Sequence, residues 1–171
     1  MRRSLAALWS VSLGALAITP GAAGQPAPGV PRYAAAVEEA LLQLDLDVRC
    51  ANEGAQRQHC RGSRKAPGGD EPLLHSEYSD ESDTVYVYLE RYLVVPSAGR
   101  RSAALLRRLM ELNWELLIGK FEWNARTGEV RLAAVVNTDS NFDRRAFRST
   151  VRALYAVAAR HRAELQALTG P

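Results

Sequence analysis

Two cysteines and three histidines carry the most distinctive side-chain chemistry in this chain of 171 residues. Cys50 and Cys60 enclose a stretch rich in Asn, Gly and Gln, which suits a hairpin loop or an insertion. Cysteines of an exported protein commonly pair, and closing so small a ring stabilises the folded state by roughly 3 kcal/mol in the loop-entropy estimate. We therefore predict a disulfide between these two residues.

A metal site is the alternative use of the same region, with Cys50, His59, Cys60 and His75 as ligands. His59 and Cys60 are adjacent, and the side chains of consecutive residues diverge. The spacing of the four residues also matches none of the usual tetrahedral zinc patterns. The disulfide is the favoured interpretation, and we predict neither a metal nor another cofactor.

Side chains that could form a reaction centre are not grouped along the chain. Nucleophilic hydrolysis needs a nucleophile, a base and an orienting group within reach of one another. His161 lies near the apolar stripe of a predicted helix, where a lone imidazole is more often structural. Glu122 and Glu129 approach each other across a predicted hairpin, where Lys120 and Arg131 balance them. The sequence contains no glycine-rich phosphate loop and no dinucleotide-binding fingerprint, so we predict a protein that is not an enzyme.

The elements of the C-terminal half follow from an apolar pattern that changes period twice within residues 112–148. A helical stripe predicts a helix over about 99–117. Phe121 and Trp123 then alternate with polar residues, and the alternating run from Val130 to Val136 predicts a second strand after a turn at 124–128. A long final helix follows, with these apolar residues on one face: Phe147, Val151, Leu154, Tyr155, Ala158, Leu165 and Leu168.

Four residues of this half have predicted architectural roles. Gly119 suits the left-handed end of a helix, and Gly128 suits a positive φ in the turn. Asp143, three residues after Ser140, resembles a capping box with Asp in place of the usual Glu or Gln. Asn113 is a polar residue on a buried stripe, so we expect its side chain to bond to the backbone of the hairpin or of a strand.

The N-terminal half predicts a helix over 32–44 and strands over 46–50, 73–78 and 84–89, with a loop at 63–70. Residues 90–95 either extend the last of these strands or leave it. The resulting order is α-β-β-β-α-β-β-α. It predicts an α+β fold, a two-layer sandwich in which a mainly antiparallel sheet of five strands packs against helices, in a single domain over 32–171.

Residues 112–117 (LNWELL), 119–121 (GKF) and 128–132 (GEVRL), with the run into the last helix, resemble the C-terminal half of the YbjN domain. The similarity extends from about Thr84 to Leu168. YbjN is a bacterial family linked to the type III secretion chaperone-like fold. The resemblance implies a two-layer α/β sandwich, often dimeric, which acts through protein–protein contacts, and it implies no substrate.

The N-terminus has the pattern of a secretory signal peptide over residues 1–24. Arg2 and Arg3 precede a short apolar core, and small residues follow, with cleavage expected after Ala23 or Gly24. The alternative is an uncleaved anchor helix, although the apolar run is short for a membrane span. We predict a flexible leader over 25–31, a periplasmic or secreted protein, and no membrane contact after cleavage. Secretion chaperones in the strict sense work in the cytoplasm, so that role does not transfer unchanged.

Net charge gives little support to nucleic-acid binding. The chain has 22 basic and 19 acidic residues, and loss of Arg2 and Arg3 with the signal peptide leaves a net charge of +1. The charge is polarised, with the acidic excess before residue 100 and the basic excess after it. Two solvated faces explain this polarity; the alternative is that the acidic turn at 80–83 meets an arginine-rich helix of a partner subunit.

An interface is the more promising functional feature. The helix over 99–117 carries an apolar flank away from its core stripe, formed by Leu106, Met110, Trp114, Leu117 and Ile118. A flank with Trp and Met suits a helix–helix seam, and we predict a homodimer through it. The alternative is that a sheet edge or the N-terminal helix covers these residues.

Two classes of function remain. The first is an exported protein-binding, chaperone-like or regulatory module of the cell envelope, which captures an extended segment of another protein. The second is a small-molecule or lipid-binding protein, with a pocket between sheet and helices lined by Tyr86, Tyr88, Phe121 and Trp123.

Overall fold

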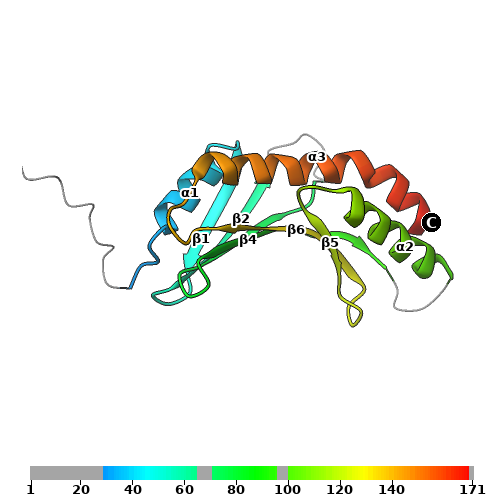
Figure 1. The fold of residues 1–171 in the computed structure, drawn as a ribbon, viewed down its shortest axis with the longest axis horizontal. Helices are drawn as coiled ribbons and strands as arrows, with labels where there is room; N and C mark the ends of the chain where they lie inside the picture. Colours follow the sequence, from blue (N-terminus) through cyan, green and yellow to red (C-terminus); the bar gives the residue numbers. More distant parts are fainter. Residues whose placement is uncertain (1–28, 65–70, 96–99, 170–171) are drawn as a thin grey trace, which may run out of the picture.

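The computed structural model describes residues 29–64, 71–95 and 100–169, which contain three helices and six strands (Figure 1). In chain order these elements are α1 (Ala34–Leu42), β1 (Leu46–Asn52), β2 (Arg57–Arg64), β3 (Leu74–Ser79), β4 (Thr84–Val94), α2 (Arg100–Glu115), β5 (Lys120–Trp123), β6 (Glu129–Asn137) and α3 (Arg144–Thr169). The predicted α+β class is confirmed.

All six strands form one antiparallel sheet in the order β1-β2-β3-β4-β6-β5. The three helices lie on one side of it, with α3 running along the sheet above β6 (Figure 1). The core lies between these two layers, where alternate residues of the strands meet the apolar faces of the helices. None of the three described helices lies on the opposite side of the sheet (Figure 1). We call this side the open face.

The sheet has one strand more than the predicted order, and the extra strand is β2. Its sequence, RQHCRGSR, contains almost no residue that favours a strand. The buried residues of β2 are Gln58, Cys60 and Gly62, so side-chain hydrophobicity alone gives no alternating signal there. Pairing with β1 on one side and β3 on the other makes this segment a strand, which is a tertiary effect.

The strand β4 continues through residues 90–94, after an irregularity between Leu89 and Leu93 where its register with β6 shifts. Arg91 has φ of 48° there, a left-handed conformation typical of a bulge. The acidic turn before β4 is balanced within the chain, because Arg32 pairs with Asp83 at 2.5 Å and Arg57 with Glu81 at 3.2 Å. The proposed contact of this turn with a partner's arginines is therefore not needed to neutralise it.

Two glycines and a cap shape the C-terminal half. Gly119 has φ of +80°, and a Cβ there would lie 2.7 Å from Leu154 Cδ2, so both backbone conformation and packing require glycine. Gly128 has φ of +76° in the β5–β6 turn. The carboxylate of Asp143 accepts hydrogen bonds from the backbone N–H groups of Arg145 and Ala146, so Asp143 is itself the N-cap of α3. The capping role expected of Ser140 is wrong, because α3 begins three residues later than that role requires.

The predicted signal peptide and leader lie outside the described residues, apart from the last residues of the leader. Among the helices of the described ranges, none is long and apolar enough to cross a membrane.

Candidate functional site

The two cysteines lie directly opposite each other on β1 and β2 and form a disulfide, with a Cα–Cα distance of 4.0 Å. Both sulfurs lie on the helix side of the sheet, in the same row of inward-facing residues as the buried Ser76. The stretch between the cysteines is a hairpin, as one of the two sequence-based interpretations expected. Its loop closes with a backbone hydrogen bond from Glu53 to Arg57.

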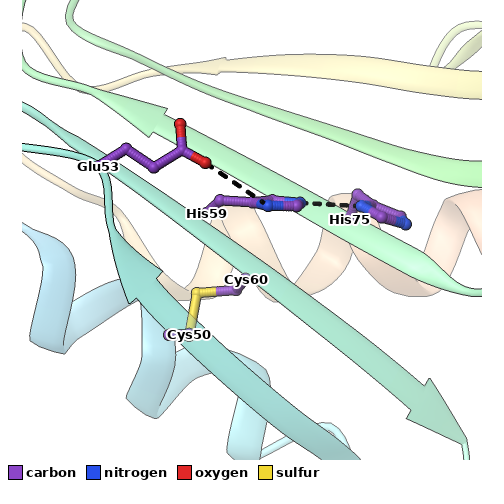
Figure 2. The surroundings of a disulfide bond; sticks show 5 residues. All are labelled: Cys50, Glu53, His59, Cys60 and His75. Atoms are coloured by element: carbon purple, nitrogen blue, oxygen red, sulfur yellow. Dashed lines mark hydrogen bonds and ion pairs between the residues drawn. A yellow bond between two sulfur atoms is a disulfide. The ribbon is translucent and has the colours of Figure 1, made fainter.

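The two histidines of the same region lie on the other side of the sheet (Figure 2). His59 precedes Cys60 in β2, and alternation along the strand sends the two side chains to opposite faces. The four candidate metal ligands are thus divided between two faces. Within the described ranges, no group of three or more His, Cys, Asp or Glu residues could hold a metal ion.

Aromatic rings and an arginine guanidinium stack on the open face across β3, β4 and β6. The rings of His75 and Tyr88 are parallel within 7° at 4.9 Å, and the Arg131 guanidinium lies over the rings of both Tyr86 and Tyr88. Glu122 accepts hydrogen bonds from the Tyr86 hydroxyl at 2.6 Å and from Arg131 Nε at 2.7 Å. The hydroxyl of Tyr86 and the Nε of Arg131 are thus held by one carboxylate, which orders this part of the open face.

Ionisation states on the open face follow from these contacts. Burial, with the nearby Glu77 carboxylate, raises the pKa of Tyr88 to about 12, and burial with the Glu122 contact raises the pKa of Tyr86 further. Partial burial is the largest single effect on Arg131 and lowers its pKa, but the hydrogen bond to Glu122 together with the charge interactions with Glu122, Tyr86 and Tyr88 raises the pKa of the guanidinium on balance. The two hydroxyls are thus neutral and the guanidinium is charged throughout the physiological range.

The predicted aromatic pocket does not form. Phe121 is opposite Leu132 and Trp123 is opposite Val130, and all four pack with the core on the helix side. Tyr86 and Tyr88 point to the open face instead, where they meet Arg131. The two pairs are separated by the thickness of the sheet, because strand alternation within β4 and β5 places them on opposite faces. The sheet–helix pocket is therefore a wrong prediction.

The apolar flank of α2 is exposed. Trp114 is 91% exposed, Leu117 98%, Met110 68% and Ile118 42%, whereas Leu106 is partly buried against the core. The helix α1 packs on β1, β2 and α3 and so does not cover this flank. Figure 1 places α1 and α2 at opposite ends of the molecule. The helix ends at Glu115, earlier than predicted, so Leu117 and Ile118 lie in the bend before β5 and not on α2. We call Met110, Trp114, Leu117 and Ile118 the α2 patch.

The edge of the sheet beside this patch is closed by Asn113. The Phe121 backbone N–H donates to Asn113 Oδ1 at 2.7 Å, and Asn113 Nδ2 donates to the Phe121 carbonyl at 3.0 Å. The side-chain amide thus bonds to β5 as a further strand would, which is the kind of backbone contact expected of it. Lys120 Nζ donates to the carbonyls of Asn113 and Leu116 and so caps the end of α2.

Charges along α2 run against its helix dipole. The basic residues fall in the N-terminal half, as Arg100, Arg101, Arg107 and Arg108, and the acidic residues Glu111 and Glu115 fall in the C-terminal half. No acidic residue lies in the first turn and no basic residue in the last turn, where each would be favourable. Arg108 is bonded within the chain, to Glu164 at 2.5 Å and to Glu111 at 3.3 Å.

Comparison with known proteins identifies no family. No protein-family model matches the chain, so the resemblance to the YbjN domain stays a prediction. No curated protein matches it either. Among solved structures, the crystal structure of the ExsC-ExsE complex is similar, with a TM-score of 0.44 and 16% identity, over 77% of this chain and 95% of that chain. At this level nothing about the role or partner of this chain follows.

Sequence reasoning missed one constellation, the pair His59 and His75 with Glu90. His75 Nε2 lies 2.8 Å from Glu90 Oε2, and the two histidines are bonded to each other at 2.9 Å. The three residues come from β2, β3 and β4, and their meeting depends on the pairing of β2. Alternation in residues 57–61 is the only sequence signal, and polar residues occupy both faces of it.

Proposed function

We propose that this chain is an exported, non-enzymatic protein-binding module of the cell envelope that works as a homodimer joined through α2. The α2 patch is the observation that carries the proposal. Trp114 at the end of α2 and Leu117 in the bend that follows the helix are each more than nine-tenths exposed. Exposed apolar clusters of this kind mark interaction surfaces, and aromatic anchors dominate the energy of such contacts.

Charge supports a second copy of the chain as the occupant of the patch. In an antiparallel pair of α2 helices, the basic N-terminal half of each helix faces the acidic C-terminal half of the other. The same arrangement opposes the two helix dipoles, and it places Met110 and Trp114 of both copies along one seam. The charged residues that oppose the helix dipole in an isolated α2 would thereby attract the opposite charges of the partner's α2.

The capture of an extended protein segment uses the remaining edge of the sheet. β5 is short and closed by Asn113, whereas β1 is seven residues long and lies at the opposite edge. An extended partner can pair with such an edge through its main chain, which gives affinity with little sequence selectivity. The disulfide holds β1 to β2 and so keeps this edge ordered.

The dimer is tested by Trp114→Glu, measured by sedimentation of the mature protein. We expect the wild type to sediment as a dimer and the variant as a monomer, because a charge would be buried in the seam. Leu42→Glu is the matched control, since Leu42 is 54% exposed at the end of α1 and away from the patch. The control should remain dimeric. Sedimentation of the wild type as a monomer, or of both variants as dimers, would contradict the proposal.

Export and partner binding need separate measurements. N-terminal sequencing of protein from the envelope fraction should find a chain that begins after Ala23 or Gly24, and a chain that retains Arg2 and Arg3 in the cytoplasm would refute export.

Affinity capture from the native envelope should recover a recurrent protein partner. A co-purified small molecule without any protein would favour a ligand-binding function instead.

A further inference from the structure

Two histidines from neighbouring strands meet end to end on the open face. His59 Nε2 lies 2.9 Å from His75 Nδ1, the ring planes are 19° apart and the centroids are 5.1 Å apart. The rings therefore touch edge to edge, because the nitrogen–nitrogen contact and the two ring radii together account for the centroid separation. Figure 2 shows the pair with Glu53 at the far end of His59, where Glu53 Oε1 lies 3.9 Å from His59 Nδ1. At the other end, His75 Nε2 bonds to Glu90 Oε2 at 2.8 Å.

Glu53, His59, His75 and Glu90 thus form a row, and the positions of its hydrogens can be assigned from its two ends. An ionised Glu90 only accepts, so His75 Nε2 must carry a hydrogen, and a neutral His75 then has a bare Nδ1. His59 Nε2 must therefore donate to that nitrogen. A neutral His59 is left with a bare Nδ1 that faces the Glu53 carboxylate. One added proton at His59 Nδ1 completes the row, with an imidazolium between a carboxylate and a hydrogen-bond acceptor.

A second proton has no place in the row. It would have to go to His75 Nδ1, and the two facing nitrogens would then both carry hydrogens. Two donors cannot share a hydrogen bond, so the 2.9 Å contact would be lost and two imidazolium rings would repel each other. The first proton is compatible with the row, and the second breaks it.

The surrounding charges come from three strands and one turn. Glu77 on β3 is directly opposite His59, Arg61 on β2 is directly opposite His75, and Tyr88 on β4 lies parallel to the His75 ring. The Tyr88 hydroxyl donates to Glu77 at 3.1 Å. Glu53 in the β1–β2 turn lies beside His59, and Glu90 on β4 lies beside His75.

We propose that Glu53, His59, His75 and Glu90 form a proton-sensitive latch that fastens the β1–β2 hairpin to the rest of the sheet. The latch joins β2 to β3 and β4, whereas the disulfide joins β1 only to β2. The buried side of β2 contributes little apolar contact, since it presents Gln58, Cys60 and Gly62, and the buried Gln58 Oε1 has no hydrogen-bond partner among the described residues. When the latch opens, the hairpin loosens from β3 as one disulfide-bonded unit, and β3 gains a free edge.

Amide hydrogen exchange of residues 57–64 tests this directly, in the mature protein with its disulfide intact. After correction for the intrinsic pH dependence of exchange, the protection of these amides should fall about tenfold between about pH 7.5 and pH 5, the range in which imidazoles titrate. In His59→Gln the side-chain amide can present its N–H to a neutral His75 and, after rotation, its carbonyl to a protonated His75. The contact therefore survives protonation of His75, and the protection of these amides should not depend on pH.

His161→Gln is the matched control, because His161 lies on α3 and bonds to Glu164. This variant should keep the pH dependence of the wild type. An unchanged pH dependence in His59→Gln would overturn the latch. Nitrogen-15 spectra of the wild-type imidazoles give a second test that needs no variant: both rings should carry hydrogen on Nε2 at neutral pH, and an Nδ1–H form of His75 would equally overturn it.

Discussion

The two ends of the sheet are held by different means. At the β5 end, α2 packs on α3 and β5, Asn113 closes the edge strand, and the β5–β6 turn lies tightly against Val95. At the β1 end, a polar hairpin is fastened by a disulfide on one face and by the histidine row on the other. Each end has a helix packed on it, since α1 contacts β1 and β2. The β1 end differs because it has, in addition, two bonds that can be broken chemically, the disulfide and the histidine contact. By the proposal above, the β1 end is the one that redox state and pH loosen.

Two glycines at corresponding turns give the sharpest test of this difference. Gly128 in the β5–β6 turn and Gly54 in the β1–β2 turn have φ of +76° and +80°. A Cβ at Gly128 would lie 2.3 Å from the Val95 carbonyl oxygen, whereas nothing lies within 4 Å of one at Gly54. We expect Gly128→Ala to destabilise by about 4 kcal/mol, from left-handed strain plus overpacking of about 1–3 kcal/mol each.

Gly54→Ala is the control for backbone strain alone and should cost about 1 kcal/mol. Urea denaturation of both variants measures the free energy of unfolding. Equal losses in the two variants would mean that the β5–β6 turn is no more tightly packed than the β1–β2 turn.

Removal of the disulfide has the next largest expected effect, and it should be local. The double variant Cys50→Ala, Cys60→Ala should lose about 3 kcal/mol of stability by the loop-entropy estimate. Hydrogen exchange should rise first in β1 and β2, while β5 and β6 stay protected. Exchange that rises evenly over the whole sheet would show that the hairpin is not a separate unit.

The contrast between the two ends also explains what the sequence could predict. The order of elements in the C-terminal half is predicted correctly because its apolar period is local: Leu105, Leu109 and Leu112 are buried on α2, and Phe121 is buried in β5. β2 is missed because its pairing partners, not its own residues, make it a strand. The histidine row is missed for the same reason.

Tyr86 and Tyr88 teach a narrower lesson. Their alternation predicts a strand correctly, but it does not say which set of alternate residues faces the helices. Val85, Val87 and Leu89 are the buried set, so the tyrosines face outward and the aromatic pocket is lost. The cysteine pair is predictable because the short loop that a Cys50–Cys60 disulfide closes fits a hairpin, whichever face of the sheet the sulfurs occupy.

The two hydrogen bonds between the Asn113 side chain and the backbone of Phe121 form an edge clamp on β5. Asn113→Leu tests whether this clamp, rather than packing alone, holds β5. The substitution leaves the N–H and carbonyl of Phe121 without their partner, which should cost about 2 kcal/mol. We expect an earlier and less cooperative urea transition. Asn113→Asp retains the acceptor for the Phe121 N–H and should lose less than the leucine variant. A leucine variant more stable than the wild type would show that the clamp has no stabilising role.

Alkaline pH should lower the stability of the β5 end of the sheet through Tyr92. This is the smallest effect that we expect. Burial, opposed in part by Arg162, raises the pKa of Tyr92 to about 12, and its hydroxyl donates to the Ala158 carbonyl at 2.8 Å on α3. The folded state thus favours the neutral phenol. A raised folded pKa gives stability that is fully present below about pH 10, the unfolded value, and is lost as the pH rises toward 12.

Tyr92→Phe removes this contribution together with one hydrogen bond worth about 1 kcal/mol. At neutral pH the variant should therefore unfold at slightly lower urea concentration than the wild type, and the gap should close as the pH rises above 10. Tyr155, another buried tyrosine with a pKa raised to about 12, provides the comparison, since its hydroxyl has no hydrogen-bond partner among the described residues. Tyr155→Phe should show no loss at neutral pH. If the difference in stability between the wild type and Tyr92→Phe instead widened as the pH rose, the phenolate would be tolerated between β4 and α3. Water would then reach this part of the core more easily than its side-chain burial indicates.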